Sequence, residues 1–158
     1  MRALLGTLAK KLRDSVNTTS VKRVIVGRND HPMESDLPQI QVYPEETRIE
    51  LSGTAKDVQT RAVKIRAIAN SKITLNQTTG INTVSSMLSL ISLFEAQKAN
   101  GAFSTASILG VLRNDPTVNG KELYTDNMSV NYGSLDDLGF SNVSAELTCV
   151  FKSRDLRK

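Results

Sequence analysis

Two segments in which polar and apolar residues alternate strictly constrain the fold more than any other feature. Gln39–Tyr43 and Thr47–Ser52 both alternate with a period of two, which is typical of half-buried strands. Pro44–Glu46 interrupts the pattern, and proline lacks the amide donor that a strand ladder needs. The pattern therefore predicts two short strands, 38–43 and 47–52, that meet at a tight corner.

The alternation also predicts which side chains of this strand pair are buried. The apolar set is expected to face a core and comprises Ile40, Val42, Ile49 and Leu51. The polar set is expected to face water or a partner chain and comprises Gln39, Gln41, Arg48 and Glu50. Neither set carries a reactive group, so this part of the chain predicts architecture and no chemistry.

Periodicity predicts two main helices and further strands elsewhere in the chain. Leucines three and four residues apart predict a helix over 2–16, and a broad apolar face predicts a second over 83–99, with Thr83 as its N-cap. The polar segment 70–82 is expected to be a loop. β-Branched runs or alternation predict the remaining strands, at 21–26, 60–69, 124–135 and 142–152.

These elements predict an α+β fold: a mostly antiparallel sheet with two main helices packed on one side. The 158 residues suffice for one core and are too few for two independent domains, so 1–158 is expected to be a single domain. No apolar run approaches the roughly 20 residues that a membrane span needs. The one cysteine, Cys149, is expected to point inward and is typical of synthesis in a reducing cytoplasm.

Residue patterns of known catalytic or metal-binding chemistry are missing from the sequence. His31 is the only histidine, and although Asp30, Glu34 and Asp36 lie close to it, their spacing matches no metal-binding motif. A histidine with no nucleophile or second base nearby in sequence is also a poor catalytic residue. We therefore expect no enzyme activity, no metal and no cofactor.

The densest group of basic residues comprises Arg61, Lys64, Arg66 and Lys72, in a chain with a formal charge of +4. Such a group is either the solvated face of a strand or a surface that contacts phosphates or an acidic partner. Proteins that bind single-stranded nucleic acid place aromatic residues among the basic ones for base stacking. No aromatic residue lies between Tyr43 and Phe94. A basic nucleic-acid-binding module stays open as an alternative function.

Taken in order, the parts of the chain resemble the tail terminator, or tail completion, proteins of long-tailed bacteriophages. The resemblance covers nearly the whole chain, and short motifs carry it. They are an N-terminal helix, the strand Leu37-Pro38-Gln39-Ile40-Gln41-Val42-Tyr43-Pro44, a mid-chain amphipathic helix, the turn Asp115-Pro116-Thr117-Val118-Asn119-Gly120 and the closing strand Ala145-Glu146-Leu147-Thr148-Cys149-Val150-Phe151.

The resemblance implies a structural virion protein that forms a homohexameric ring at the head-proximal end of the tail tube. Such a ring ends tube polymerisation, offers a docking surface to the neck or connector proteins for head–tail joining, and lets DNA pass through its lumen without sequence-specific binding. A different neck or head-closure protein, or the tail tube subunit itself, is the neighbouring interpretation. Candidate contacts with a neighbouring subunit or the tube are Tyr43, Glu45, Glu46, Arg48 and Glu50.

Overall fold

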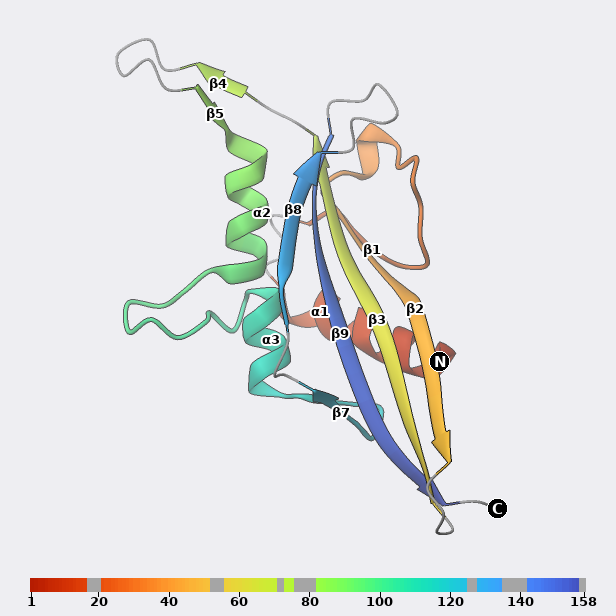
Figure 1. The fold of residues 1–158 in the computed structure, drawn as a ribbon. Helices are drawn as coiled ribbons and strands as arrows, with labels where there is room; N and C mark the ends of the chain where they lie inside the picture. Colours follow the sequence, from red (N-terminus) through yellow and green to blue (C-terminus); the bar gives the residue numbers. More distant parts are fainter. Residues whose placement is uncertain are drawn as a thin grey trace.

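The computed structural model describes residues 1–16, 21–51, 56–70, 73–75, 82–124, 128–134 and 142–156 (Figure 1). The described residues form a curled, mixed β-sheet with helices on one face, which confirms the predicted α+β class. Three long antiparallel strands make its centre: β2 (Gln39–Leu51), β3 (Lys56–Asn70) and β9 (Asn142–Leu156). In Figure 1 these strands lie side by side and curve past helix α1 (Arg2–Ser15).

Shorter strands cover parts of the two borders of this central sheet. On one border, β1 (Arg23–Val26) pairs in parallel with the first residues of β2. On the other, β8 (Val130–Ser134) and β7 (Lys121–Tyr124) pair with successive parts of β9. The outermost strand on this border, β6 (Thr117–Val118), forms a hairpin with β7. Asn119 and Gly120 join the two strands, and their φ values of 51° and 70° suit a two-residue turn of type I′.

The helices supply the apolar layer that covers one face of the sheet. Besides α1, the described part of the chain contains α2 (Ser85–Glu95), α3 (Ile108–Asn114) and a single 3₁₀ turn, Glu34–Asp36. The Ser107 hydroxyl caps α3 by accepting a hydrogen bond of 3.2 Å from the Gly110 amide. Helix and sheet residues form one buried cluster, which includes Leu4, Leu8, Leu12, Leu90, Phe94, Ile108, Leu112, Ile40, Val42, Val63, Ile65, Leu147, Cys149 and Phe151.

The predicted corner between 38–43 and 47–52 is wrong, because the two segments form the single strand β2. Its register against β3 runs from Gln39 to Leu51 and shifts only between Pro44 and Glu46, where Glu45 is the extra residue of a β-bulge. The bulge accommodates a proline without an amide donor and lets the ladder continue beyond it. An interrupted alternation therefore indicated a bulge here and not a turn.

Burial along β2 also differs from the prediction. Ile40 and Val42 are buried as expected, but Ile49 is 56% exposed because the helices do not reach this end of the sheet. Gln39 and Gln41, predicted to face water or a partner, are 1% and 0% exposed. The reason is that segment 27–36 crosses this face of the sheet, and the Gln41 side-chain amide donates a hydrogen bond of 2.7 Å to the Asn29 carbonyl.

The predicted helix boundaries agree best with the structure at the N-terminus, where the helix predicted over 2–16 corresponds to α1. The helix predicted over 83–99 is shorter at both ends, and Thr83 is not its N-cap but lies in strand β5 (Asn82–Val84). β5 pairs with β4 (Ile73–Leu75). Part of the expected loop 70–82 is therefore a two-stranded ribbon. The segment Ile108–Leu112, for which no helix was predicted, forms the first part of α3.

The strand predictions for the other segments are confirmed, with adjusted ends. β1 lies within the predicted range 21–26, and β3 extends beyond the predicted range 60–69 at both ends. β9 begins at Asn142, as predicted, and continues beyond residue 152. The predicted strand 124–135 is divided, since Tyr124 ends β7 and β8 begins at Val130. The sequence also predicts an acidic turn at Asp136 and Asp137, between the last two predicted strands, and these residues lie outside the described part of the chain.

Candidate assembly surface on the sheet

The border of β2 beyond Tyr43 is an open sheet edge. β1 pairs with β2 only over Gln39–Val42, and the last hydrogen bond on that side joins the Gly27 amide to the Val42 carbonyl at 2.9 Å. From Pro44 onward, no strand among the described residues pairs with the outer side of β2, while β3 continues on its inner side. An edge of this kind offers unpaired backbone groups to another chain.

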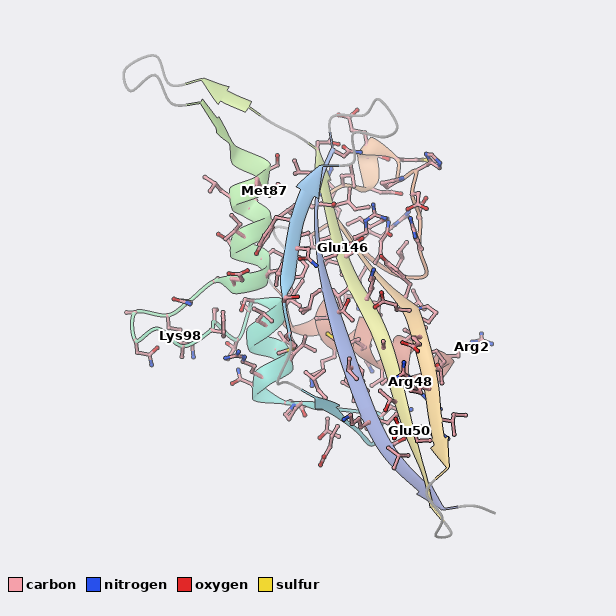
Figure 2. All side chains as sticks on the ribbon, viewed as in Figure 1. Arg2, Arg48, Glu50, Met87, Lys98 and Glu146 are labelled. Carbon is pink, nitrogen blue, oxygen red and sulfur yellow. The ribbon has the colours of Figure 1, made fainter. Side chains whose placement is uncertain are left out.

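Four of the five predicted interface residues lie along this open edge: Glu45, Glu46, Arg48 and Glu50 are all exposed. Figure 2 shows Arg48 and Glu50 on the part of β2 near its C-terminal end. Arg48 pairs with Glu46 at 3.2 Å, and Glu45 pairs with Lys64 of the neighbouring strand β3 at 3.0 Å. Because these ion pairs are exposed or only partly covered, they contribute little stability and are available to a partner.

Tyr43, the fifth predicted residue, is not part of the exposed surface. Its side chain is 7% exposed, and its hydroxyl donates a hydrogen bond of 3.2 Å to the Glu146 carboxylate. Burial, with a smaller contribution from Glu146, raises the pKa of Tyr43 to about 12. Tyr43 therefore already has its partner within the fold and offers little exposed surface for the predicted contact with another subunit.

The predicted basic cluster is divided by the fold. Alternation along β3 places Arg61 on the helix-covered face with Val63, whereas Lys64 and Arg66 lie on the opposite face. The Arg61 guanidinium donates to Gln59 at 2.6 Å, and Lys64 pairs with Glu45. Lys72 lies outside the described residues. The described members therefore do not form one open cationic surface.

Arg66 is the centre of a polar network that sequence reasoning missed. It is 4% exposed, and its guanidinium nitrogens lie 2.9 Å from an Asp30 oxygen and 3.3 Å from a Glu146 oxygen. Figure 2 marks Glu146 on β9, whereas Asp30 belongs to the segment 27–36 that crosses the sheet. A period of two predicts a solvated polar face, so only the position of this segment shows that the face is covered.

The acidic residues near His31 are engaged in contacts that hold the crossing segment 27–36. Asp30 accepts from Arg28 at 2.8 Å as well as from Arg66, and these two guanidinium groups lower the pKa of its carboxyl. Asp36 pairs with Arg23 at 2.7 Å, and Glu34 accepts from Asn70 at 3.2 Å. No group of three or more His, Cys, Asp or Glu within the described ranges could hold a metal ion.

Cys149 lies on the buried side of β9, as predicted, and has 0% exposure. Burial raises the pKa of its thiol to about 12, so the thiol is neutral at physiological pH. Because the thiolate is the reactive species, we expect a disulfide reagent at pH 8 to label the folded chain at least about 100-fold more slowly than the chain in urea. Equal labelling rates with and without urea would contradict this burial.

None of the described helices is long and apolar enough to cross a membrane. No protein-family model matches the chain, and no curated protein matches its sequence. Function therefore has to be inferred from the open edge of the sheet and from the sequence motifs.

Proposed function

We propose that this chain is a structural virion protein of a long-tailed phage, which forms a ring at the head-proximal end of the tail tube. The ring would end tube polymerisation and offer the neck a docking surface. The observation that carries the proposal is the open edge of β2 over Pro44–Leu51, at the end of a sheet that extends beyond its helices. An interface that uses it needs no reactive centre.

Ring closure requires two different surfaces that bind each other, because each copy contacts its neighbours head to tail. The sheet has such a pair of borders. Among the strands that the structure describes, β2 has no outer neighbour beyond Tyr43 on one border, and on the other β8 pairs only with β9 and has Asn131 and Gly133 exposed. Pairing of one copy's β2 edge with the next copy's β8 edge would join the sheets and remove both open edges.

The sequence motifs that resemble tail terminators lie at central places in this fold. Leu37–Pro44 comprises the first residues of β2 and the two residues before it, Asp115–Gly120 leads from α3 into the hairpin of β6 and β7, and Ala145–Phe151 is the middle of β9. These segments set the width of the sheet and the position of its borders. This placement supports the resemblance because the similar segments are those that would shape a ring subunit.

The alternative of a nucleic-acid-binding module has less support. Lys64 and Arg66 have carboxylate partners within the chain, and Arg61 lies on the other face of β3. Phosphate binding through these residues would first have to break their ion pairs. DNA in the lumen of a ring needs no such contacts, since it only has to pass.

The assembly state of the purified full-length chain tests the proposal. Mass photometry and negative-stain electron microscopy are expected to show closed rings of six copies that stop growing as the concentration rises. A monomer at every concentration would overturn the proposal. Open-ended tubes that lengthen with concentration would instead identify the neighbouring interpretation, a tube subunit.

Substitution of Ile49 by lysine is expected to disrupt the ring. Ile49 is an exposed apolar residue on the open edge of β2, and a lysine on a strand edge opposes pairing with another strand. We expect the dissociation constant for assembly to rise about 100-fold, with an unchanged circular dichroism spectrum. The matched control is Met33→Lys, which places the same charge at an apolar residue 72% exposed outside the sheet. Equal assembly of both variants would exclude this edge from the interface.

A further inference from the structure

A long uncharged stretch forms a second surface, separate from the edge of β2. No charged residue occurs between Lys72 and Glu95, although 23% of the whole chain is charged. The stretch contains β4, β5 and nearly all of α2. Depletion of charge is what distinguishes the centre of a protein interface from ordinary surface.

Helix α2 carries large apolar residues on its exposed side as well as on its buried side. Leu90, Leu93 and Phe94 face the core, with exposures of 1%, 8% and 0%. Leu88 and Ile91, three residues apart and therefore neighbours on the helix surface, are 54% and 38% exposed. The core does not need these two side chains, so they are available to a partner.

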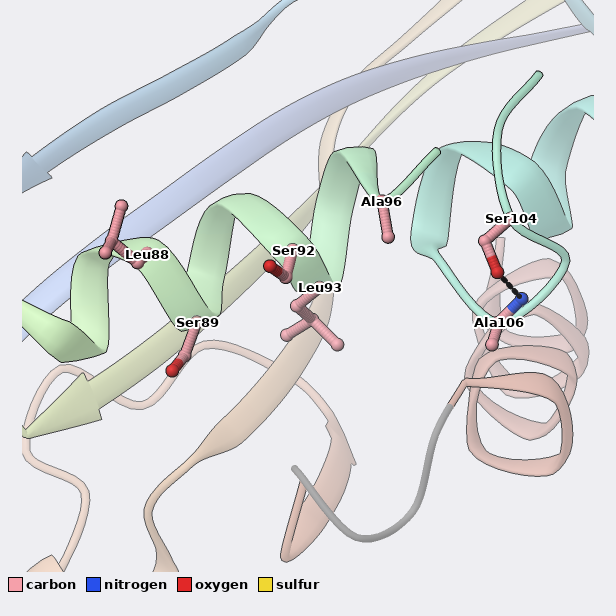
Figure 3. Close-up of a pocket in the computed structure, with 7 residues that line it drawn as sticks. All are labelled: Leu88, Ser89, Ser92, Leu93, Ala96, Ser104 and Ala106. Carbon is pink, nitrogen blue, oxygen red and sulfur yellow. Dashed lines mark hydrogen bonds between the residues drawn. The ribbon is translucent and has the colours of Figure 1, made fainter. Parts of the chain in front are cut away.

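An uncharged groove runs beside this exposed side of α2. It has a volume of about 420 Å³ and is lined only by serine, alanine and leucine side chains (Figure 3). Leu88, Ser92 and Ala96 line it from the helix and its end, and Ser104 and Ala106 from the segment that leads to α3. The groove therefore suits an uncharged binding partner.

The ribbon of β4 and β5 is uncharged, as the groove is, and lies at the N-terminal end of the same helix. Within the described residues it pairs with no further strand, and Figure 1 shows it projecting beyond the N-terminal end of α2. The groove extends along α2 to Ala96, just after its C-terminal end. An isolated two-stranded ribbon is only marginally stable in water unless it packs on another element.

We propose that the β4/β5 ribbon of one copy packs into the α2 groove of the next copy. Ribbon and groove are both uncharged, and the ribbon pairs with no further strand among the described residues. The ribbon lies at the N-terminal end of α2, and the groove runs along the helix to its C-terminal end. A head-to-tail contact of this kind repeats around a ring. The inference rests on the proposed ring and supplies it with an inter-subunit contact distinct from the β2 edge.

Introducing charge into the groove tests the contact. In the double variant Leu88→Glu, Ser92→Glu we expect the dissociation constant for assembly to rise at least about 100-fold, because both residues line the groove and would be desolvated in the contact. Met33→Glu, at an exposed apolar residue away from α2, is the matched control and should assemble normally. Unchanged assembly of the double variant would overturn the inference while leaving the ring intact. A wild-type chain that never assembles would overturn the proposed function itself.

Cross-linking between copies tests the geometry independently of stability. Cys149 is buried, so an introduced cysteine would be the reactive thiol. Mixing Ser92→Cys in the groove with either Asn82→Cys or Thr83→Cys, which are successive residues of β5, should give a mixed dimer with a short bis-maleimide. Ser92→Cys that cross-links only to itself, or assembled mixtures that give no product, would overturn the inference.

Discussion

Replacement of Phe94 by alanine is expected to lower the free energy of unfolding by about 3 to 5 kcal/mol, the largest effect of any single substitution considered for this chain. Phe94 is among the largest fully buried side chains and anchors α2 in the cluster shared with the sheet and α3. Its removal loses the transfer free energy of the ring and leaves a cavity that the surrounding strands can close only in part. Urea denaturation followed by circular dichroism measures the change.

Leu88→Ala on the same helix is the matched control for Phe94→Ala. Leu88 is 54% exposed, so its truncation should change the stability of the monomer by no more than about 0.5 to 1 kcal/mol. The two variants together separate the buried side of α2 from its exposed side. If both lowered the stability equally, the orientation of α2 on the sheet would be wrong, and with it the groove.

Substitution of Arg66 by methionine is expected to cost about 1 to 3 kcal/mol. Removal of one partner from a fully buried ion pair costs about 3 to 5 kcal/mol, because the other charge is left without compensation. Here the Asp30 and Glu146 side chains are 41% and 33% exposed, so they regain part of their hydration and the cost is smaller. Lys64→Met, on the same face of β3 with a partly exposed partner, should change stability by about 0 to 1 kcal/mol.

The pH dependence of stability provides a second readout for the same network. Arg28 and Arg66 lower the pKa of Asp30 below its ordinary value of 3.8. The ionised carboxylate therefore stabilises the fold fully above pH 3.8, and this contribution is lost as the pH falls from there through the lowered pKa. Asp30→Asn should show a smaller loss of stability between pH 6 and pH 3 than the wild type. Parallel pH profiles of the two proteins would mean that the carboxylate does not hold the crossing segment 27–36.

Local patterns predicted most of the elements because their causes are local. The leucine spacing of α1 and the alternation of β9 each have a single interpretation, and both elements form as expected. The interruption at Pro44–Glu46 has two interpretations, a turn or a bulge. The choice depends on whether β3 continues alongside, which involves residues far away in the sequence.

The candidate sites could be predicted only in part, for the same reason. Exposure of Glu46, Arg48 and Glu50 follows from their charge, and the structure confirms it. Burial of Tyr43 and Arg66 depends on segment 27–36 and on Glu146, and no pattern within β2 or β3 indicates either. The uncharged stretch between Lys72 and Glu95 was visible in the sequence, but its apolar residues fit a core helix equally well.

The sequence by itself determined most of the helices and strands and which face of the sheet is apolar, because periodicity and turn chemistry act over a few residues. Only the tertiary structure decided that β2 is one strand with an open edge, that a crossing segment covers the polar face over Arg66, and that α2 presents Leu88 and Ile91 to solvent. These features depend on which distant segments meet. Burial and strand pairing result from contacts between segments that are distant in the sequence, and a single stretch of sequence does not specify such contacts.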